Sequence, residues 1–375
     1  MKIGVVTLPL HTNYGGVLQA YALQYSLRSM GHDPYLVDCR LNPRYANFVK
    51  RPALLIVRAL AWAIPSLADQ LRSSERQLRA DKVVMRHNVE SFIAKNISLK
   101  HYLDYSFIGR RDFEAFVVGS DQVWRPEYFR PIAAAYLNFA RKWSVKRVAY
   151  AASFGLDEWS YNESQGEQCR RLAKLFDAIS VRENTAINLC NKYLERDAQE
   201  VLDPTLLLPK RVYLDLVEQA NIPASSGNMM VAILDATPDK EHLVDLLAAN
   251  YSASKFSVNS RVEDRSAPLE ERIQPPVEQW LKGFVDADYV VTDSYHAAIF
   301  AIIFNRPFVV YTNPERGATR FHSLLSKLGL EQQMISSSED LCLDSCFDID
   351  WEGVNAKLLR LRRESLEFLN SALQA

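Results

Sequence analysis

The chain has 375 residues, of which 48% are hydrophobic and 24% are charged, as in an ordinary soluble globular protein with large cores. Its formal net charge of −1 excludes a global field that attracts nucleic acid or an anionic membrane, although a local basic cluster can still bind a small anion. At this length two domains are expected rather than one.

The first residues, MKIGVVTLPL, form an apolar run too short for a signal peptide, so we expect a first strand and a cytoplasmic protein. The most apolar long stretch, residues 52–71, is interrupted by Arg58 and Pro65. It falls short of the roughly 18 to 20 uninterrupted apolar residues of a membrane span. Two readings remain: a helix packed on a domain, or a peripheral helix on the inner face of a membrane.

Five scattered cysteines indicate reduced thiols and no zinc site.

The N-terminal half alternates short β-branched runs with helical periods. KIGVVTL predicts a strand, VLQAYALQYSLRSMG a helix that stops at Gly31, and DPYLVDC a second strand. This β-α-β opening predicts a parallel sheet. Residues 47–95 are charged and carry few turn signals, a pattern that predicts a helical insertion between strands. Further strands are expected within the segments 113–124, 146–155, 176–184 and 199–209.

The composition changes at a polar segment, residues 221–228. After it the pattern predicts helix 239–250, strand 255–259, helix 277–284, strand 288–291, helix 295–304, strand 307–311 and a final helix over 351–375. We therefore expect an α/β protein with two domains, 1–210 and 226–350, joined near 205–225. Ligands bind beyond the carboxyl ends of parallel strands, so the predicted site is the cleft between the halves.

Two polar turns follow predicted strands of the N-terminal half. Asn13, Tyr14 and Gly15 begin a helix, where backbone N–H groups suit an anion or a sugar hydroxyl. A tight βα turn explains them equally simply. Asp121 and Trp124 could hold a sugar, since the carboxylate accepts hydroxyl protons and the ring covers C–H groups. The alternative is that Asp121 caps a helix.

Ionisable groups follow three other strand ends. Arg182 has the planar shape that binds a carboxylate or phosphate, or it forms a salt bridge with Glu183 or a neighbouring acid. Arg316 and Arg320 face the same cleft, or lie at a solvated helix start. His296 falls in the first turn of a helix, where it either points toward the ligand site or packs as a neutral core residue.

Taken in order, NYGGVLQAYAL, VGSDQVW, SVREN, VLDPTLLL and TDSYHAAIFAIIFNRPFV resemble the polysaccharide pyruvyl transferase family, and NPERGATRFHSLLSKLGL is typical of its bacterial branch. The resemblance covers nearly the whole chain, least of all the insertion at 47–95. It implies two Rossmann-like domains facing each other across a cleft, similar to the GT-B arrangement, with the acceptor on the N-terminal side and the donor on the C-terminal side.

Members of known activity transfer the carboxyvinyl carbon of phosphoenolpyruvate onto a saccharide as a cyclic ketal and release phosphate. The resemblance therefore implies a transferase of surface or capsular polysaccharide biosynthesis. Its partners would be phosphoenolpyruvate as a co-substrate and a saccharide, either free or lipid-linked. No other cofactor and no metal are expected, since arginines can supply the positive charge.

The family's R-L-H histidine matches His296, and the arginine of its S-V-R motif matches Arg182. Ser294 and Tyr295 stand where the characterised members carry arginine and leucine, so we infer that Arg316 or Arg320 replaces a donor-binding arginine. In this hypothesis His296 is the general acid.

The same hypothesis makes Asp121 orient or deprotonate the acceptor hydroxyl.

Two rival functions remain open. A glycosyltransferase that uses a nucleotide sugar would need an acidic residue for the ribose, and Glu278 and Asp293 are candidates. A non-catalytic glycan-binding homologue fits the departure at Ser294.

Overall fold

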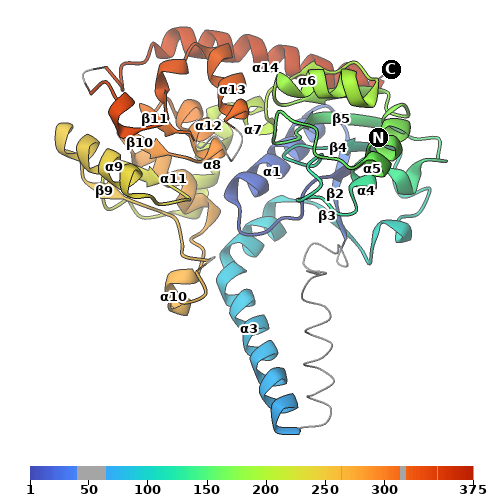
Figure 1. The fold of residues 1–375 in the computed structure, drawn as a ribbon, viewed down its shortest axis with the longest axis horizontal. Helices are drawn as coiled ribbons and strands as arrows, with labels where there is room; N and C mark the ends of the chain where they lie inside the picture. The colour runs from blue at the N-terminus through green and yellow to red at the C-terminus, as the bar shows by residue number, and fades with distance from the viewer. Residues whose placement is uncertain (40–64, 263, 313–317, 344, 375) are drawn as a thin grey trace.

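The computed structural model describes residues 1–39, 65–262, 264–312, 318–343 and 345–374. Two fully parallel sheets organise the chain (Figure 1). The N-terminal sheet has seven strands in the order β3-β2-β1-β4-β5-β6-β7, and the C-terminal sheet has five in the order β12-β11-β10-β8-β9. Parallel pairing requires crossover connections, which the helices between successive strands supply.

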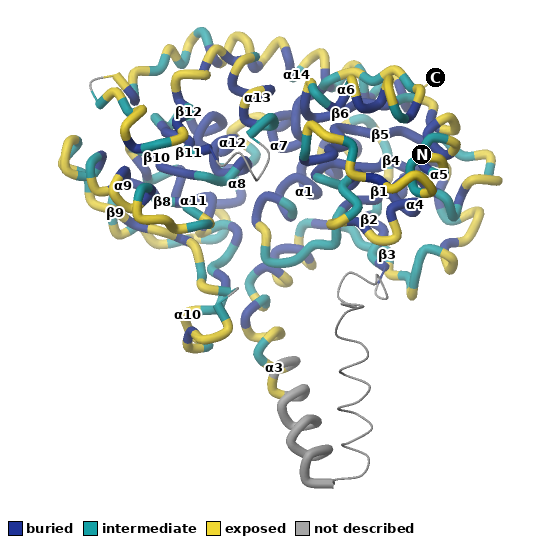
Figure 2. The backbone as a smooth tube through the Cα atoms, in the orientation of Figure 1, coloured by how far each residue is buried: buried dark blue, intermediate teal, exposed yellow. Residues whose placement is uncertain are grey.

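The strands of the N-terminal sheet are β1 (Lys2–Val6), β2 (Asp33–Cys39), β3 (Leu99–Tyr102), β4 (Ala115–Val118), β5 (Lys146–Ala152), β6 (Ala178–Val181) and β7 (Gln199–Glu200). Those of the C-terminal sheet are β8 (Met229–Ala232), β9 (Lys255–Phe256), β10 (Tyr289–Thr292), β11 (Phe308–Tyr311) and β12 (Met334–Ile335). The central strands are buried on both faces, as expected for sheets covered by helices (Figure 2).

The helices of the N-terminal half are α1 (Tyr14–Ser29), α3 (Pro65–Asn96), α4 (Ile132–Ala135), α5 (Glu163–Ala173), α6 (Thr185–Leu189) and α7 (Pro204–Leu207). Those that follow are α8 (Lys210–Ala220), α9 (Pro238–Asn250), α10 (Leu269–Arg272), α11 (Val277–Asp286), α12 (Tyr295–Phe304), α13 (Thr319–Leu328) and α14 (Trp351–Gln374). Among the described helices, none has the length and apolar character needed to cross a membrane.

Alternate residues of each strand enter different cores. In β4, Ala115 and Val117 join the core formed with α1 and α14, whereas Phe116 and Val118 join the core under α4 and α5. This alternation follows from the two-residue period of a strand. The core with α1 and α14 is continuous with one face of the C-terminal sheet and with the wholly buried helix α12, so the halves share hydrophobic contacts.

Helix α3 connects the predicted insertion to both halves. It projects from the body of the molecule (Figure 1). Near its C-terminal end, the ring of Phe92 packs at 5.9 Å from that of Tyr21 in the N-terminal half. On the other side, Met85 O accepts a hydrogen bond from Gln274 N at 2.9 Å, and Asn88 Nδ2 donates to Gln274 O at 2.7 Å. Most of the apolar stretch 52–71 lies outside the described residues.

Three strands differ from the prediction, one that was expected and two that were not. The strand expected at 255–259 is shortened to β9, and β3 and β12 were not predicted from the pattern. Both missed strands have four residues or fewer, too few to display a clear period. The final helix, in contrast, is continuous as α14 and packs on α7 and β5 of the N-terminal half.

The return of α14 to the N-terminal half should contribute strongly to stability. Leu369 is fully buried there, whereas Leu359 on the same helix is 56% exposed. We expect Leu369→Ala to lower the free energy of unfolding by about 2 to 5 kcal/mol, because it leaves a cavity in the core. Leu359→Ala is the matched control and should change it by at most about 0.5 kcal/mol. Urea unfolding measures both, and equal effects would contradict the docking of α14.

Candidate functional site

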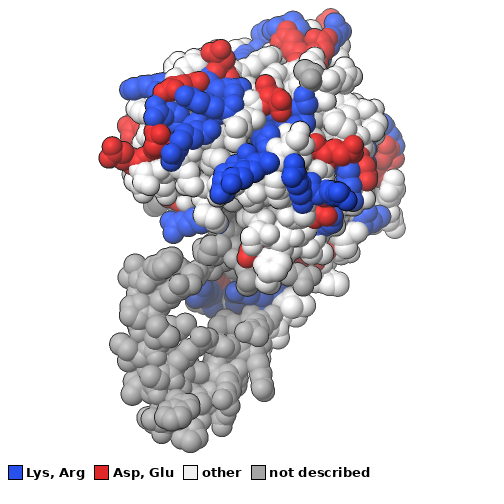
Figure 3. Space-filling model, turned by 90° about the vertical axis from the view of Figure 1, so that its right-hand side faces the viewer, with Lys and Arg blue, Asp and Glu red and all other residues white. Residues whose placement is uncertain are grey.

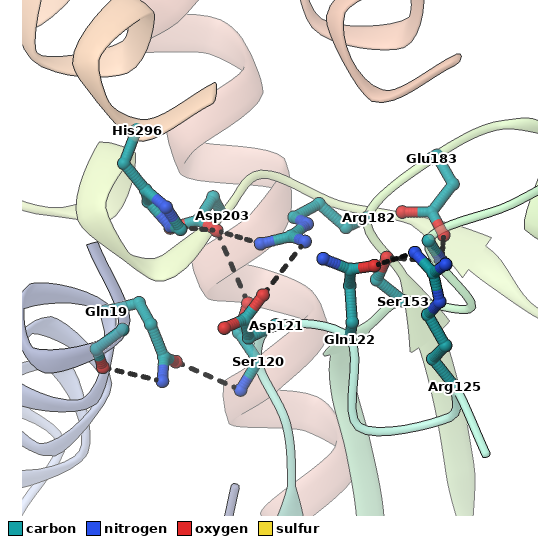
Figure 4. Close-up of polar contacts among 12 residues, drawn as sticks. Gln19, Ser120, Asp121, Gln122, Arg125, Ser153, Arg182, Glu183, Asp203 and His296 are labelled. Carbon is teal, nitrogen blue, oxygen red and sulfur yellow. Dashed lines mark hydrogen bonds and ion pairs between the residues drawn. The ribbon is translucent and has the colours of Figure 1, made fainter. Parts of the chain in front are cut away.

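Four ionisable side chains meet where the two halves of the chain come together (Figure 4). Asp121 follows β4, Arg182 follows β6, Asp203 begins α7, and His296 lies in the first turn of α12. All four are buried, with at most 7% of any residue exposed. Their positions at strand ends explain the meeting, since the carboxyl ends of parallel strands lie at one edge of a sheet.

Arg182 is held between two carboxylates. Its Nη1 donates to Asp203 Oδ2 at 2.9 Å, and its Nη2 donates to Asp121 Oδ1 at 3.4 Å. Burial disfavours the charged guanidinium, but its neighbours raise the pKa of Arg182 above its usual value. Both terminal nitrogens of Arg182 are therefore engaged by the protein itself.

Asp203 lies between the arginine and the histidine. Burial alone would raise the pKa of Asp203, but His296 and Arg182 outweigh it and hold that pKa well below its usual range. The carboxylate is thus ionised at neutral pH. Its Oδ1 accepts hydrogen bonds from Thr205 N at 3.0 Å and Thr205 Oγ1 at 2.8 Å, which fix its orientation at the start of α7.

His296 is enclosed on two sides. Its Nε2 lies 3.6 Å from Asp203 Oδ2, within ion-pair distance but longer than a good hydrogen bond. That nitrogen is buried and has no hydrogen-bond partner among the described residues. On the other side the ring lies against Gly15 of α1, where an added Cβ would fall 2.1 Å from Nδ1. Only glycine fits there with the ring in this position.

The β4 turn is braced by polar groups of the N-terminal half. Ser120 N donates to Gln19 Oε1 at 3.2 Å, and Gln19 Nε2 donates to Thr7 Oγ1 at 3.1 Å. Thr7 Oγ1 in turn donates to Ser120 O at 3.0 Å. Asp121 itself has a φ of 68°, in the left-handed region that aspartate tolerates better than most residues. These contacts direct Asp121 toward Arg182.

Tyr295 lies beside two arginines. Its ring centroid is 4.8 Å from Arg182 Cζ and 5.4 Å from Arg320 Cζ. Arg320 is half-buried at the start of α13, and burial together with the nearby Arg182 lowers its pKa. The structure therefore brings Arg320 to the cluster, as the sequence predicted. Arg316 lies outside the described residues.

A second polar network lies beside the cluster (Figure 4). Glu183 is fully buried, and its Oε1 accepts from Phe154 N at 3.0 Å and more weakly from Gly155 N at 3.4 Å. The contacts of Glu183 with Phe154 and Gly155 fix the loop after β5. In the same network Gln122 Oε1 accepts from Arg125 Nη1 at 3.0 Å. The salt bridges of Arg182 are formed with Asp203 and Asp121 and not with Glu183.

Residues at the start of α1 take different places. Asn13 caps the helix by accepting from Gly16 N at 3.3 Å and stays exposed. Tyr14 instead joins the two halves: its hydroxyl donates to Pro275 O at 2.8 Å, and its ring stacks 5.4 Å from that of Trp280. In this conformation the Tyr14 hydroxyl is occupied by the protein.

The expectation that Trp124 offers a face to a sugar is corrected. The ring is fully buried, stacked on Tyr136 at 5.0 Å and packed against Phe154 at 5.3 Å. An aromatic side chain beside a polar turn can point inward as readily as outward, and here the core under α4 and α5 takes it. Trp124 therefore has no accessible face for a ligand.

Ser294 occupies the cap position of α12, but its side chain makes no cap hydrogen bond within the described residues. The preceding Asp293 is held by Lys240, whose Nζ donates to Asp293 Oδ2 at 2.7 Å. Both side chains of this pair are almost fully buried. Asp293 is thus already paired, whereas Glu278 lies in the first turn of α11.

Asp203 is the site residue that sequence reasoning missed. It lies in VLDPTLLL, a segment used only for the family resemblance. The available signal was the Asp-Pro pair at a helix start, where aspartate caps and proline occupies the first turn. That signal predicts a cap, and only the fold shows that the second carboxylate oxygen faces Arg182 and His296.

Removing the Asp203 charge should weaken the fold in a pH-dependent way. We expect Asp203→Asn to lower the free energy of unfolding at pH 7 by about 3 to 5 kcal/mol, because Arg182 loses a buried counter-charge. With its lowered pKa, wild-type Asp203 contributes stability that is present above its unfolded pKa near 3.8 and is lost as pH falls through the folded pKa. Urea unfolding from pH 7 to pH 3 should therefore show a shallower acid loss for the variant.

Asp215→Asn is the control for this experiment, because Asp215 forms an exposed pair with Arg211. Its removal should change little. An Asp203→Asn variant as stable as this control would refute the central role given to the buried carboxylate.

Comparisons with known proteins agree with this architecture. The family model described as polysaccharide pyruvyl transferase matches residues 13–315. No curated protein matches the chain.

Solved structures with a similar fold include the UDP-GlcNAc 2-epimerase from Neisseria meningitidis bound to UDP-GlcNAc, with a TM-score of 0.54, 10% identity, and coverage of 98% of this chain and 99% of that one. A glycosyltransferase from Rickettsia africae gives a TM-score of 0.50 at 11% identity, covering 99% and 98%. At these identities the likeness concerns the fold alone, and it confirms two Rossmann-like domains in a GT-B-like arrangement.

Proposed function

Because the chain belongs to the polysaccharide pyruvyl transferase family, we propose that it transfers the carboxyvinyl carbon of phosphoenolpyruvate to a saccharide as a cyclic ketal. One observation carries the proposal: His296 from the C-terminal half lies 3.6 Å from the buried carboxylate of Asp203, beside Arg182 and Asp121 of the N-terminal half. A proton donor and a candidate base thereby lie at one place between the two domains.

His296 serves as the general acid in this proposal. Its protonated ring gives a proton to the methylene carbon of phosphoenolpyruvate, and the adjacent carbon becomes oxocarbenium-like. The Asp203 carboxylate attracts the protonated ring and fixes its direction, because opposite charges at this distance interact strongly in a buried site. Asp203 is a positioning residue here, and Arg182 keeps it ionised.

Asp121 accepts the proton of the first attacking sugar hydroxyl. Phosphate then leaves with the electron pair of its C–O bond and takes the proton held by Asp121, and the neighbouring hydroxyl closes the ketal. The second hydroxyl returns its proton to His296. The reaction thus converts phosphoenolpyruvate and a diol into a ketal and phosphate without an oxidant or reductant.

Arg320 is the arginine we assign to the anionic donor. It is half-buried next to Tyr295, whereas Arg182 is wholly enclosed by its two carboxylates. Arg182 binds the donor only if one of those carboxylates moves. Ser294, with a side chain that makes no cap contact in the described structure, is the second group we place near the donor.

The cluster is closed in this conformation. His296, Asp121 and Arg182 are all at least nine-tenths buried, and Tyr14 fastens the first turn of α1 to Pro275 of the other half. We propose that substrates enter when the two halves move apart, and that closure then excludes water from the oxocarbenium-like centre. Asn13 and Gly15, on the same turn, would lie beside the acceptor.

His296→Ala should reduce product formation about 10² to 10⁴-fold while the protein stays folded, because general acid catalysis contributes that much. Mass spectrometry of a glycan acceptor incubated with phosphoenolpyruvate detects the added pyruvate unit, and a phosphate assay detects the second product. His242→Ala, on an exposed turn of α9, is the control and should keep full activity. Near-normal turnover of His296→Ala would remove the histidine from the mechanism.

Gly15→Ala should also impair turnover, because its methyl group would meet the His296 ring at 2.1 Å and displace it. Gly16→Ala is a matched control, since there the nearest atom is Asn13 Cγ at 3.7 Å. Alanine favours a helix over glycine, so both variants should fold. We expect at least a tenfold loss for Gly15→Ala alone, measured in the same ketal assay. Equal activities would show that the His296 position does not matter.

The rival donors can be separated by thermal unfolding. Phosphoenolpyruvate should raise the melting temperature of the wild type, because a ligand that binds only the folded state stabilises it. A shift with UDP-sugars and none with phosphoenolpyruvate would instead support a nucleotide-sugar glycosyltransferase. Binding without ketal formation would support a glycan-binding homologue.

A further inference from the structure

An exposed loop on the N-terminal half combines apolar and basic side chains. It runs from the end of β3 to the start of β4 and places Leu103 and Phe107 in solvent, at 47% and 60% exposure. Arg110 and Arg111 follow them and are also exposed. Together with Arg130, Arg141 and Lys142, these residues are called the loop patch below.

The loop is rigidly held, so its apolar side chains are presented outward rather than left unpacked. Tyr105 turns inward and stacks 5.3 Å from Phe139, and Ile108 is buried. Phe107 lies between these two anchors in a 3-10 turn and is directed to solvent. Gly109 and Asp112 then close a tight turn with Arg110 and Arg111 at its tip.

The inward ring also joins the loop to the neighbouring basic segment. Tyr105 contacts Phe139 and, at 6.1 Å, Phe129. Arg130 follows Phe129 directly, and Arg141 and Lys142 follow Phe139 within three residues; all three are exposed. Figure 3 looks onto this side of the N-terminal half and shows Lys and Arg side chains in several groups, with Asp and Glu side chains between them.

The positive charge of the loop patch is not neutralised by the protein. No member of the patch forms an ion pair with a carboxylate in the described ranges. Of the acids on the loop, Asp112 pairs with Lys100 at 3.1 Å and accepts from the Tyr102 hydroxyl at 2.7 Å, whereas Asp104 caps the 3-10 turn and Glu114 is exposed, so two acids remain against the five basic residues of the loop patch. An anionic partner would therefore meet a net positive surface.

We propose that the loop patch docks on an anionic membrane surface, with Phe107 and Leu103 entering the headgroup boundary. Exposed arginines alone would suit any anionic polymer, but a phenylalanine and a leucine held in solvent gain free energy when they leave water for an apolar phase. Basic side chains beside them attract anionic lipid headgroups within a Debye length of about 8 Å. The same combination is typical of interfacial segments.

The loop begins at the edge of the sheet that carries the site. Leu103 follows the carboxyl end of β3, and Asp121 follows the carboxyl end of β4, at the same edge of one sheet. Three strand spacings separate β3 from β4, roughly 14 Å. The loop then runs to the start of β4, so Arg110 and Arg111 lie toward the opposite, amino edge of the sheet. The docking itself does not depend on the proposed reaction.

Sedimentation with vesicles tests the proposal on the full-length protein. The wild type should bind vesicles of phosphatidylcholine with phosphatidylglycerol, and far less vesicles of phosphatidylcholine alone. Arg110→Gln with Arg111→Gln should lower the partition coefficient about 25-fold, at about fivefold for each basic residue. The control, Arg265→Gln with Arg363→Gln, removes two exposed arginines elsewhere and should bind like the wild type.

Phe107→Ser separates a membrane from a soluble anionic polymer. It should weaken vesicle binding at least fivefold without changing binding to dextran sulfate, whereas Leu234→Ser, at a 61% exposed leucine of the other half, should change neither. The proposal is overturned if anionic vesicles do not bind, if both arginine pairs matter equally, or if Phe107→Ser binds vesicles like the wild type. The ketal assay with a soluble acceptor should be unaffected by the loop variants, so failure here leaves the proposed reaction standing.

Discussion

A single buried carboxylate organises the place where the two halves meet. Asp203 is 1% exposed, and an ion there is costly unless partners surround it. Thr205, Arg182 and His296 are those partners, and they come from its own helix, the N-terminal sheet and the C-terminal half. The fold must bring all three together to keep the charge buried, so the site and the interdomain contact depend on one another.

Close packing between the two halves also restricts where the His296 ring can lie. Gly15 presents bare backbone to the His296 ring, and Tyr14 inserts beside Trp280. Helix α12 carries the histidine and is buried along its whole length. Its position is therefore set by packing against elements of both halves within one continuous core, and the imidazole is placed by the hydrophobic framework as much as by Asp203.

The sequence pattern indicated those residues of the cluster that lie directly after predicted strands. Asp121, Arg182 and His296 each stand directly after a predicted strand or at the helix start beyond it, and a parallel topology brings such positions together. Asp203 follows only a two-residue strand, and its contacts with Arg182 and His296 come from segments distant in sequence. Trp124 was placed wrongly because its burial depends on Tyr136, which no local pattern reveals.

The path of α14 has a mechanical consequence. Its first turns bind the C-terminal half, where Lys357 Nζ donates to Leu328 O at 3.0 Å; further along, Ser365 Oγ accepts from Leu202 N of the N-terminal half at 3.0 Å. The chain therefore crosses between the halves twice, once between α7 and α8 and once along α14. If the halves move apart as proposed, these two crossings would set the line about which they bend and would resist a twist of one half against the other. Each closure would then bring His296 back to the same carboxylate.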